Sequence, residues 1–176
     1  EALKMVRKIR HRGPDWSGSY SDKFCVIKHE RLSIVDVEHG AQPLYDRQNN
    51  RVLAVNGEIY NHKNLAEKLT QKHDWQTFSD CEVLLYLYDE LGTDFLNDLD
   101  GIFAFFLYDP KTKEYVVARD HMGIIPLYIG WDKNKVTYVS SEMKAIESYC
   151  EKLQEFTPGH YYKGSAGQFL KWYNTS

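Results

Sequence analysis

The stretch "LDGIFAFFLYD" (Leu99–Asp109) decides the fold class of this chain. Its centre, Ile102–Tyr108, is a continuous apolar run without the polar alternation of a strand that has one face in water. The run has the length of a strand, is bounded by Asp109-Pro110, and is far too short to span a membrane. We therefore predict a strand buried on both faces and covered by further layers of structure.

Shorter elements are predicted on both sides of this strand. Strand-like runs separated by turn residues are expected at Phe24–Lys28, Leu32–Val37, Arg51–Val55, Tyr115–Ala118, Leu127–Trp131 and Val136–Val139, with a last strand pair around Gly164–Gly167. The runs from Tyr115 to Val139 read as a meander that turns at Asp132–Lys135. Helical patterns are expected around Leu3–Ile9, over Asn61–His73 and Asp80–Leu91, and near Ser141–Ser148. Together these elements predict one α+β domain.

The bulk properties exclude several classes of function. The 176 residues are 43% hydrophobic and 27% charged with a net charge of -3, whereas nucleic-acid binders carry a basic face. The dense basic stretch Lys4–Arg12 is interpreted as the solvated face of the first helix.

Ser79 and Glu82 form an S-x-x-E capping box ahead of the third predicted helix, Asp80–Leu91.

The spacing of reactive residues argues against metal and hydrolase chemistry. The three cysteines show no C-x-x-C and the seven histidines no H-x-x-x-H spacing, so no metal site and no disulfide framework is predicted. There is no G-x-S-x-G elbow and no glycine-rich phosphate loop. This cysteine usage favours a reducing compartment, and we expect a cytoplasmic protein without a nucleic-acid or membrane partner.

The segment "VNGEIYNHKNL" (Val55–Leu65) raises the main question about function, because a predicted strand ends there on Asn56-Gly57. One interpretation is a tight turn, since Asn and Gly tolerate positive φ. The other is chemical, because a side-chain amide and an adjacent backbone N–H can stabilise an oxyanion. Neither interpretation is excluded by this segment alone.

Three charged residues at strand and helix ends carry the same ambiguity. Singly, Arg31 fits a salt bridge and Asp80 fits a charge at a helix start. Together with Glu58 they could hold a free amino acid, because a guanidinium grips a carboxylate bidentately and carboxylates bind an ammonium. Such chemistry needs a nucleophile, which the composition does not identify.

A set of motifs in fixed order narrows the choice. The motifs are "RHRGPDWSG", "HERLSIVD", "GAQPL", "NGEIYNH", "SDCE", "LDGIFAFFLYD", "ARDHMGIIPLY" and "SEMKAI", from Arg10 to Ile146. Together they resemble the glutaminase domain of the asparagine synthetase B family, a class II glutamine amidotransferase. The motif "RGPD" alone would indicate only class II amidotransferases in general.

This resemblance implies a fold and an activity. The fold would be of the N-terminal-nucleophile type, a four-layer αββα sandwich with two antiparallel sheets, in which residues 1–176 form one amidotransferase domain that lacks its first strand. The activity would be cleavage of the side-chain amide of glutamine. The ammonia would pass to a synthetase domain of the same polypeptide, which makes asparagine from aspartate with ATP and Mg. No cofactor is expected in this chain, and a homodimer is consistent with the family.

The resemblance also implies roles for individual residues. Asn56 through its side-chain amide and Gly57 through its backbone N–H resemble an oxyanion hole. Arg31 resembles the clamp for the glutamine carboxylate. Glu58 and Asp80 resemble the partners of the substrate ammonium. The strand wall beside Arg31 would consist of Leu32, Ile34 and Val35.

The nucleophile is where the chain departs from the family. The family uses a cysteine at the mature amino terminus, followed by a short strand, whereas this chain begins at Glu1 inside a helical pattern. Cys25, Cys81 and Cys150 are not N-terminal and cannot replace it. Two hypotheses follow: a fragment of a longer glutamine-hydrolysing synthetase, or a glutamine-binding regulatory module without a nucleophile. Among enzymes, the alternative is another class II amidotransferase, such as one that makes an aminated sugar phosphate.

Overall fold

The computed structural model describes residues 1–13, 16–31 and 42–173 of the chain. Its helices are α1 (Ala2–Arg7), α2 (His62–Lys68), α3 (Val83–Leu91) and α4 (Met143–Ile146), with 3-10 helices at Arg10–Arg12, Asp80–Glu82, Asp94–Asp98 and Glu147–Tyr149. Its strands are β1 (Trp16–Ser21), β2 (Val26–Arg31), β3 (Leu44–Asp46), β4 (Arg51–Ile59), β5 (Gly101–Asp109), β6 (Glu114–Arg119), β7 (Tyr128–Trp131), β8 (Thr137–Ser140), β9 (Lys152–Glu155), β10 (His160–Lys163) and β11 (Gln168–Lys171).

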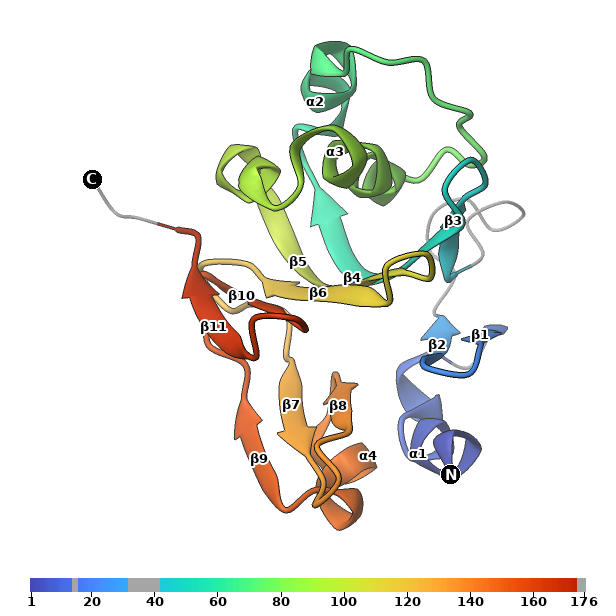
Figure 1. The fold of residues 1–176 in the computed structure, drawn as a ribbon, viewed down its shortest axis with the longest axis vertical. Helices are drawn as coiled ribbons and strands as arrows, with labels where there is room; N and C mark the ends of the chain where they lie inside the picture. The colour runs from blue at the N-terminus through green and yellow to red at the C-terminus, as the bar shows by residue number, and fades with distance from the viewer. Residues whose placement is uncertain (14–15, 32–41, 174–176) are drawn as a thin grey trace.

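β4 and β5 are neighbouring interior strands of a six-stranded antiparallel sheet with the order β11-β10-β6-β5-β4-β3 (Figure 1). Alternate residues of β5 enter two different cores, because successive side chains of a strand point to opposite faces. One core contains Phe103, Phe105 and Leu107, and the other side of the sheet contains Ala104, Phe106 and Tyr108. The prediction of a strand buried on both faces is therefore confirmed.

α2 and α3 cover one face of this sheet (Figure 1). α3 carries an unbroken buried run, Val83–Leu87, which needs cover on all sides of the helix. The loop before α3 supplies part of that cover and is held by the buried carboxylate of Glu82, which accepts bonds from the backbone N–H groups of Gln76 (2.6 Å) and Thr77 (2.7 Å). The side chain of Ser79 does cap the start of the helix, as predicted. The second bond of the predicted capping box, from the Glu82 side chain back to Ser79, is not formed, because the Glu82 carboxylate binds this loop.

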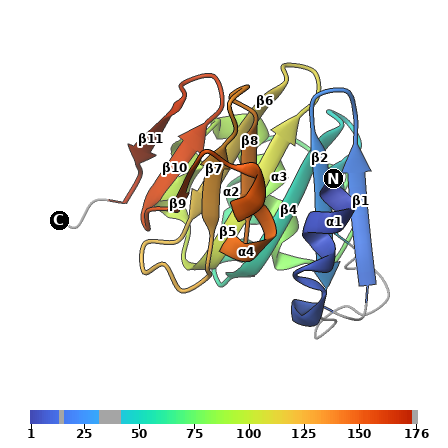
Figure 2. The same cartoon turned by 90° about the horizontal axis from the view of Figure 1, so that it is seen from below.

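The opposite face of the six-stranded sheet is covered by two small antiparallel sheets (Figures 1 and 2). One has the order β8-β7-β9 and the other consists of β1 and β2, with α4 and α1 outside them. The layers therefore run helix, sheet, sheet, helix, which confirms the predicted αββα arrangement and the α+β class. Within the described residues, the second sheet layer is divided into two separate sheets.

The predicted end of β4 at Val55 is wrong. β4 continues to Ile59, and its register with β5 runs without a break from Val52 opposite Tyr108 to Ile59 opposite Gly101. Asn56-Gly57 therefore lies inside a strand, and the tight-turn interpretation of this pair is excluded.

The predicted meander is also divided between two sheets. β6 joins the six-stranded sheet, whereas β7 pairs with β8 on one side and, on the other, with β9, a strand that the sequence pattern did not reveal. The turn at Asp132–Lys135 is confirmed, since the N–H of Lys135 bonds to the carbonyl of Asp132. The predicted strand Leu32–Val37 lies outside the described residues.

α2 ends at Lys68 and not at His73 as predicted. The backbone N–H groups that follow it, of Thr70 and Gln71, both donate to the carboxylate of Glu90 at the end of α3, which also contacts Nε2 of His73 at 2.9 Å. These bonds, the Thr70 amide above all, lower the pKa of Glu90 to about 2.

This carboxylate gives a pH-dependent contribution to stability. Because the pKa of Glu90 is lower in the folded state, its contribution is fully present above pH 4.5 and is lost as the pH falls toward 2. We expect Glu90→Gln to lower the urea midpoint at pH 7 and to differ progressively less from wild type as the pH falls from 4.5 to 2.5. Glu151→Gln, at an exposed position, is the matched control. A difference that does not change with pH would contradict this assignment.

Candidate active site

A row of backbone groups along the outer edge of β4 defines the candidate site. Since the N–H groups of a strand alternate in direction, those of Val55, Gly57 and Ile59 face the same side of β4. The N–H of Val55 donates to Oε1 of Gln42 at 2.7 Å, and the N–H of Ile59 donates to Oδ2 of Asp80 at 2.6 Å. The N–H of Gly57 lies in the same row between these two covered positions.

Gly57 can be only a glycine in this backbone conformation. Its φ is 132°, which residues with a side chain rarely adopt. A Cβ atom built at this position would lie 2.0 Å from the carbonyl oxygen of Ile102 on β5. The glycine of the Asn-Gly pair thus allows β4 to pair with β5 at a position where a side chain would collide with the β5 backbone.

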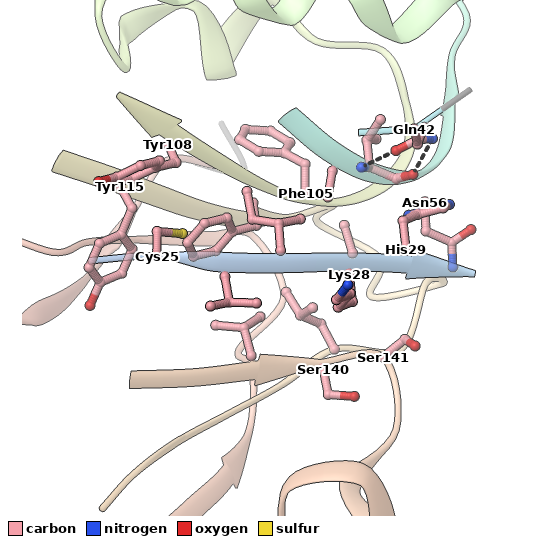
Figure 3. A pocket seen from close by; sticks show the side chains of 18 of the residues that line it. Cys25, Lys28, His29, Gln42, Asn56, Phe105, Tyr108, Tyr115, Ser140 and Ser141 are labelled. Atoms are coloured by element: carbon pink, nitrogen blue, oxygen red, sulfur yellow. Dashed lines mark hydrogen bonds between the residues drawn. The ribbon is translucent and has the colours of Figure 1, made fainter. Parts of the chain in front are cut away.

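Asn56 and Glu58 lie on the opposite side-chain face from Val55 and Ile59. Val55 and Ile59 enter the core beneath α2 and α3, whereas Asn56 and Glu58 are exposed and line the cavity on the other face of the sheet. Figure 3 shows Asn56 at the rim of this cavity. An amide, a glycine N–H and a carboxylate therefore occupy three consecutive positions of one strand.

Asp80 reaches the site from a distant part of the chain. It begins the 3-10 helix before α3, and its carboxylate bonds to β4 through Ile59, 21 residues away. This bond uses one carboxylate oxygen, and the other remains for a further donor. Asp80 thereby lines the same cavity as Asn56, Gly57 and Glu58, and the binding roles of the four residues remain predictions.

The other predicted substrate-binding residues are only partly described. Arg31 is the last residue of β2, whose preceding residues line the cavity, but its side chain lies outside the described part of the structure. Leu32, Ile34 and Val35 also lie outside it. Their roles remain predictions.

The cavity is large and has the shape of a gap between two strand edges. Its volume is about 1600 Å³, which exceeds the 300–1,000 Å³ typical of small-molecule sites. β4 and β5 form its floor, β2 one wall and β8 the other (Figure 3). In the described chain, β2 pairs only with β1, and β8 pairs only with β7, so each has a free edge. Lining residues include Val26 and Lys28 of β2, Ala54 and Phe106 of the floor, and Thr137 and Val139 of β8.

The three thiols of the chain are poor nucleophiles. Burial raises the pKa of Cys25 to about 12, with a further contribution from the charge of Asp22. Burial also raises the pKa of Cys81 well above its ordinary value, and the adjacent Asp80 adds to the shift. Burial raises the pKa of Cys150 as well. Reactive cysteines show the opposite shift, because the thiolate is the attacking species.

Neither a metal-binding cluster nor a membrane-spanning helix is found in the part of the chain that the structure describes. No group of three or more His, Cys, Asp or Glu side chains in that part of the chain could hold a metal ion. No helix there is both long enough and apolar enough to cross a membrane.

The layered fold agrees with the protein family whose model this sequence matches. Residues 1–169 match the family model described as the glutamine amidotransferase domain, and the chain belongs to this family. The resemblance inferred from the ordered motifs is therefore confirmed.

Curated relatives narrow the similarity further. The chain is 52% identical to asparagine synthetase B (glutamine-hydrolysing) of Escherichia coli K12 over 174 residues, which are 99% of this chain and 31% of that protein. It is 49% identical to a probable glutamine-hydrolysing asparagine synthetase of Dictyostelium discoideum over 175 residues, 98% of this chain and 31% of that protein. The chain thus spans about a third of the length of these relatives.

A solved structure supports the fold. Glutamine phosphoribosylpyrophosphate amidotransferase from B. subtilis, complexed with ADP and GMP, matches with a TM-score of 0.78 and 25% identity. The match covers 98% of this chain and 46% of that chain. It confirms the predicted N-terminal-nucleophile type of fold.

One contact at the site was not predicted. Gln42 lies in the quoted motif "GAQPL", but a polar residue before a proline carries no signal of its role. Only the structure shows that its amide binds both backbone groups of Val55, next to Asn56 (Figure 3).

The raised pKa values predict slow alkylation of the native thiols. At pH 8, a pKa of about 12 instead of 9.0 lowers the thiolate fraction of Cys25 about 10³-fold, and its higher nucleophilicity recovers part of this loss. We expect iodoacetamide to modify native Cys25 roughly 50-fold more slowly than the urea-unfolded chain, and Cys81 more slowly still. Peptide mass spectrometry over time measures each rate. Fast alkylation of native Cys81 would instead make it a candidate nucleophile.

Proposed function

We propose that this chain is the glutaminase part of a glutamine-hydrolysing asparagine synthetase. In this proposal it binds glutamine and releases ammonia, which a synthetase domain of the same polypeptide uses to form asparagine from aspartate with ATP. The observation that carries the proposal is the outer edge of β4, where the Gly57 N–H and the Asn56 amide adjoin the carboxylates of Glu58 and Asp80. The glutamine-hydrolysing relatives support the choice of acceptor.

The two ends of glutamine call for opposite charges, and the chain supplies both. Glu58 and Asp80 bind the α-ammonium, and the free oxygen of Asp80 is available for this contact. Arg31 binds the α-carboxylate with its planar pair of donors, beside a wall formed by Leu32, Ile34 and Val35. The side-chain amide of the substrate then extends toward Asn56 and Gly57.

The reaction is acyl transfer to a thiol. A cysteine thiolate attacks the amide carbon of glutamine, and its carbonyl oxygen becomes an oxyanion that accepts bonds from the Asn56 amide and the Gly57 N–H. Collapse of this tetrahedral intermediate breaks the C–N bond, and protonation of the leaving nitrogen gives ammonia. Water then hydrolyses the thioester to glutamate and restores the thiol.

We assign the nucleophile to a cysteine on a strand that precedes Glu1 in the whole polypeptide. The cavity between β2 and β8 suits such a strand, because both walls are strands with a free edge among the described residues. A strand paired with both would join the two small sheets into one layer with the order β9-β7-β8-strand-β2-β1. The raised pKa values of Cys25, Cys81 and Cys150 favour a nucleophile outside residues 1–176.

The remaining parts of the proposal concern the whole protein. ATP and Mg would bind the synthetase domain, so no cofactor is assigned to this chain. The whole enzyme would act in the cytoplasm, and a homodimer is one assembly consistent with its family.

Asn56→Ala tests the oxyanion hole in the whole enzyme. The Asn56 amide makes its strongest contact only when charge develops on the substrate oxygen, so we expect kcat for glutamine hydrolysis to fall about 10²- to 10³-fold with KM much less affected. The measurement is glutamate release under saturating glutamine. Asn134→Ala, at an exposed turn, is the matched control. A fall in kcat that is accompanied by a marked loss of thermal stability would instead indicate a structural role.

Arg31→Lys and Asp80→Asn test the two ends of the substrate. One ammonium cannot reproduce the two-point grip of a guanidinium, and Asn at position 80 can still accept from Ile59 while losing the charge that attracts the substrate ammonium. Each contact is worth about 1.5–3 kcal/mol, so we expect KM for glutamine to rise roughly 10- to 100-fold.

The reaction with free ammonia as nitrogen donor distinguishes a role in glutamine binding from a role in maintaining the fold, for both variants. That reaction bypasses the glutamine site, so its rate should stay at the wild-type level. If both variants lose the ammonia-dependent reaction as severely as the glutamine-dependent one, the two residues maintain the fold and do not bind glutamine.

A further inference from the structure

Gln42 extends a β ladder with its side chain. β3 pairs with β4 from Asp46 opposite Arg51 to Leu44 opposite Leu53. Two steps further in the same register, position 42 falls opposite Val55. There the side-chain amide of Gln42 makes both bonds that a strand partner would make: Nε2 donates to the Val55 carbonyl at 2.7 Å, and Oε1 accepts from the Val55 N–H at 2.7 Å (Figure 3).

The backbone of Gln42 packs closely against β1. Its carbonyl oxygen packs against Gly18 on β1, where a Cβ atom would lie 1.6 Å from it. Only a glycine at position 18 permits this approach. Gln42 therefore lies between β1 on one side and β4 on the other.

These contacts determine which backbone donors remain along the edge of β4. The N–H groups of Val55, Gly57 and Ile59 face one side, about 6.6 Å apart from one to the next. Gln42 covers Val55 and Asp80 covers Ile59, which leaves the Gly57 N–H between them. Gln42 also covers the Val55 carbonyl, an acceptor that would otherwise lie close to a developing oxyanion and repel it.

We infer that Gln42 is a positioning residue for the oxyanion hole: its amide holds the Val55 peptide groups, and so fixes the orientation of Asn56 and Gly57 and leaves Gly57 as the backbone donor to the substrate oxygen. This inference rests on the proposed glutaminase function and deepens it. Gln42 acts through Val55, because the oxygen and the nitrogen of its amide each make one hydrogen bond to that residue.

The test is Gln42→Met in the whole enzyme, which keeps the side-chain volume and removes both bonds. A misplacement of about 1 Å at a reacting group can cost about 10²-fold, so we expect kcat for glutamine hydrolysis to fall roughly 10- to 100-fold. KM for glutamine should change less than about threefold, and the ammonia-dependent reaction should stay unchanged. Gln168→Met, at an exposed position on β11, is the control.

A transition-state analogue distinguishes positioning from a general loss of structure. Glutamate γ-semialdehyde adds the active-site thiol and forms a tetrahedral oxyanion in the same place as the intermediate. Its inhibition constant should rise in Gln42→Met by the same factor as kcat falls, whereas inhibition by the planar product glutamate should not change. An unchanged inhibition constant for the aldehyde would overturn the inference.

A second variant covers the case in which Gln42→Met does not fold. Gln42→Glu keeps an acceptor for the Val55 N–H but places a carboxylate oxygen against the Val55 carbonyl, so at neutral pH its kcat should fall at least tenfold. Wild-type kcat in either folded variant, or equal losses of the glutamine- and ammonia-dependent reactions, would overturn the role of Gln42. A wild-type enzyme that releases no glutamate from glutamine would instead overturn the proposed function itself.

Discussion

The antiparallel ladder between β4 and β5 is the interaction on which the rest of the structure depends. Eight residue pairs join the two strands in the middle of the molecule, where buried backbone groups must be hydrogen-bonded. The side chains of β5 alternate between the core beneath α3 and the core beneath the small sheets. Because both layers are built on this ladder, the glycine that keeps it paired at Gly57 serves the fold and the candidate site at once.

Buried and half-buried carboxylates hold the loops at the ends of this sheet. Glu82 and Glu90 accept the amides of the loops beside α3, and Asp120 accepts from the N–H of Phe103 on β5 and from that of Ile124. A carboxylate is costly to bury unless several donors surround it, and each of these has them. The loop that delivers Asp80 is consequently held in one place relative to β4.

The candidate site lies along the part of β4 that has no neighbouring strand on its outer side among the described residues. A strand with a free edge presents a row of peptide groups, and here the side chains of Gln42 and Asp80 occupy the positions on both sides of Gly57. Along this edge the N–H groups of Val55 and Ile59 are therefore occupied, and the Gly57 N–H remains available as a donor beside polar side chains. Acyl-transfer chemistry needs a donor fixed in advance, and a strand backbone supplies it without reorganisation.

The sequence by itself determined the buried strand and the α+β class and made Asn56, Gly57, Glu58 and Asp80 candidate site residues, because apolar runs and motif order are local properties of the chain. The sequence marks Gly57 as a residue that tolerates positive φ but does not show where it lies, since the signal for positive φ is the same in a turn and in a paired strand. The tertiary structure alone decided that β4 continues to Ile59, that β9 joins β7, and that Gln42 covers Val55. Each of these depends on groups far apart in sequence, whose contact is fixed by packing and not by local preference.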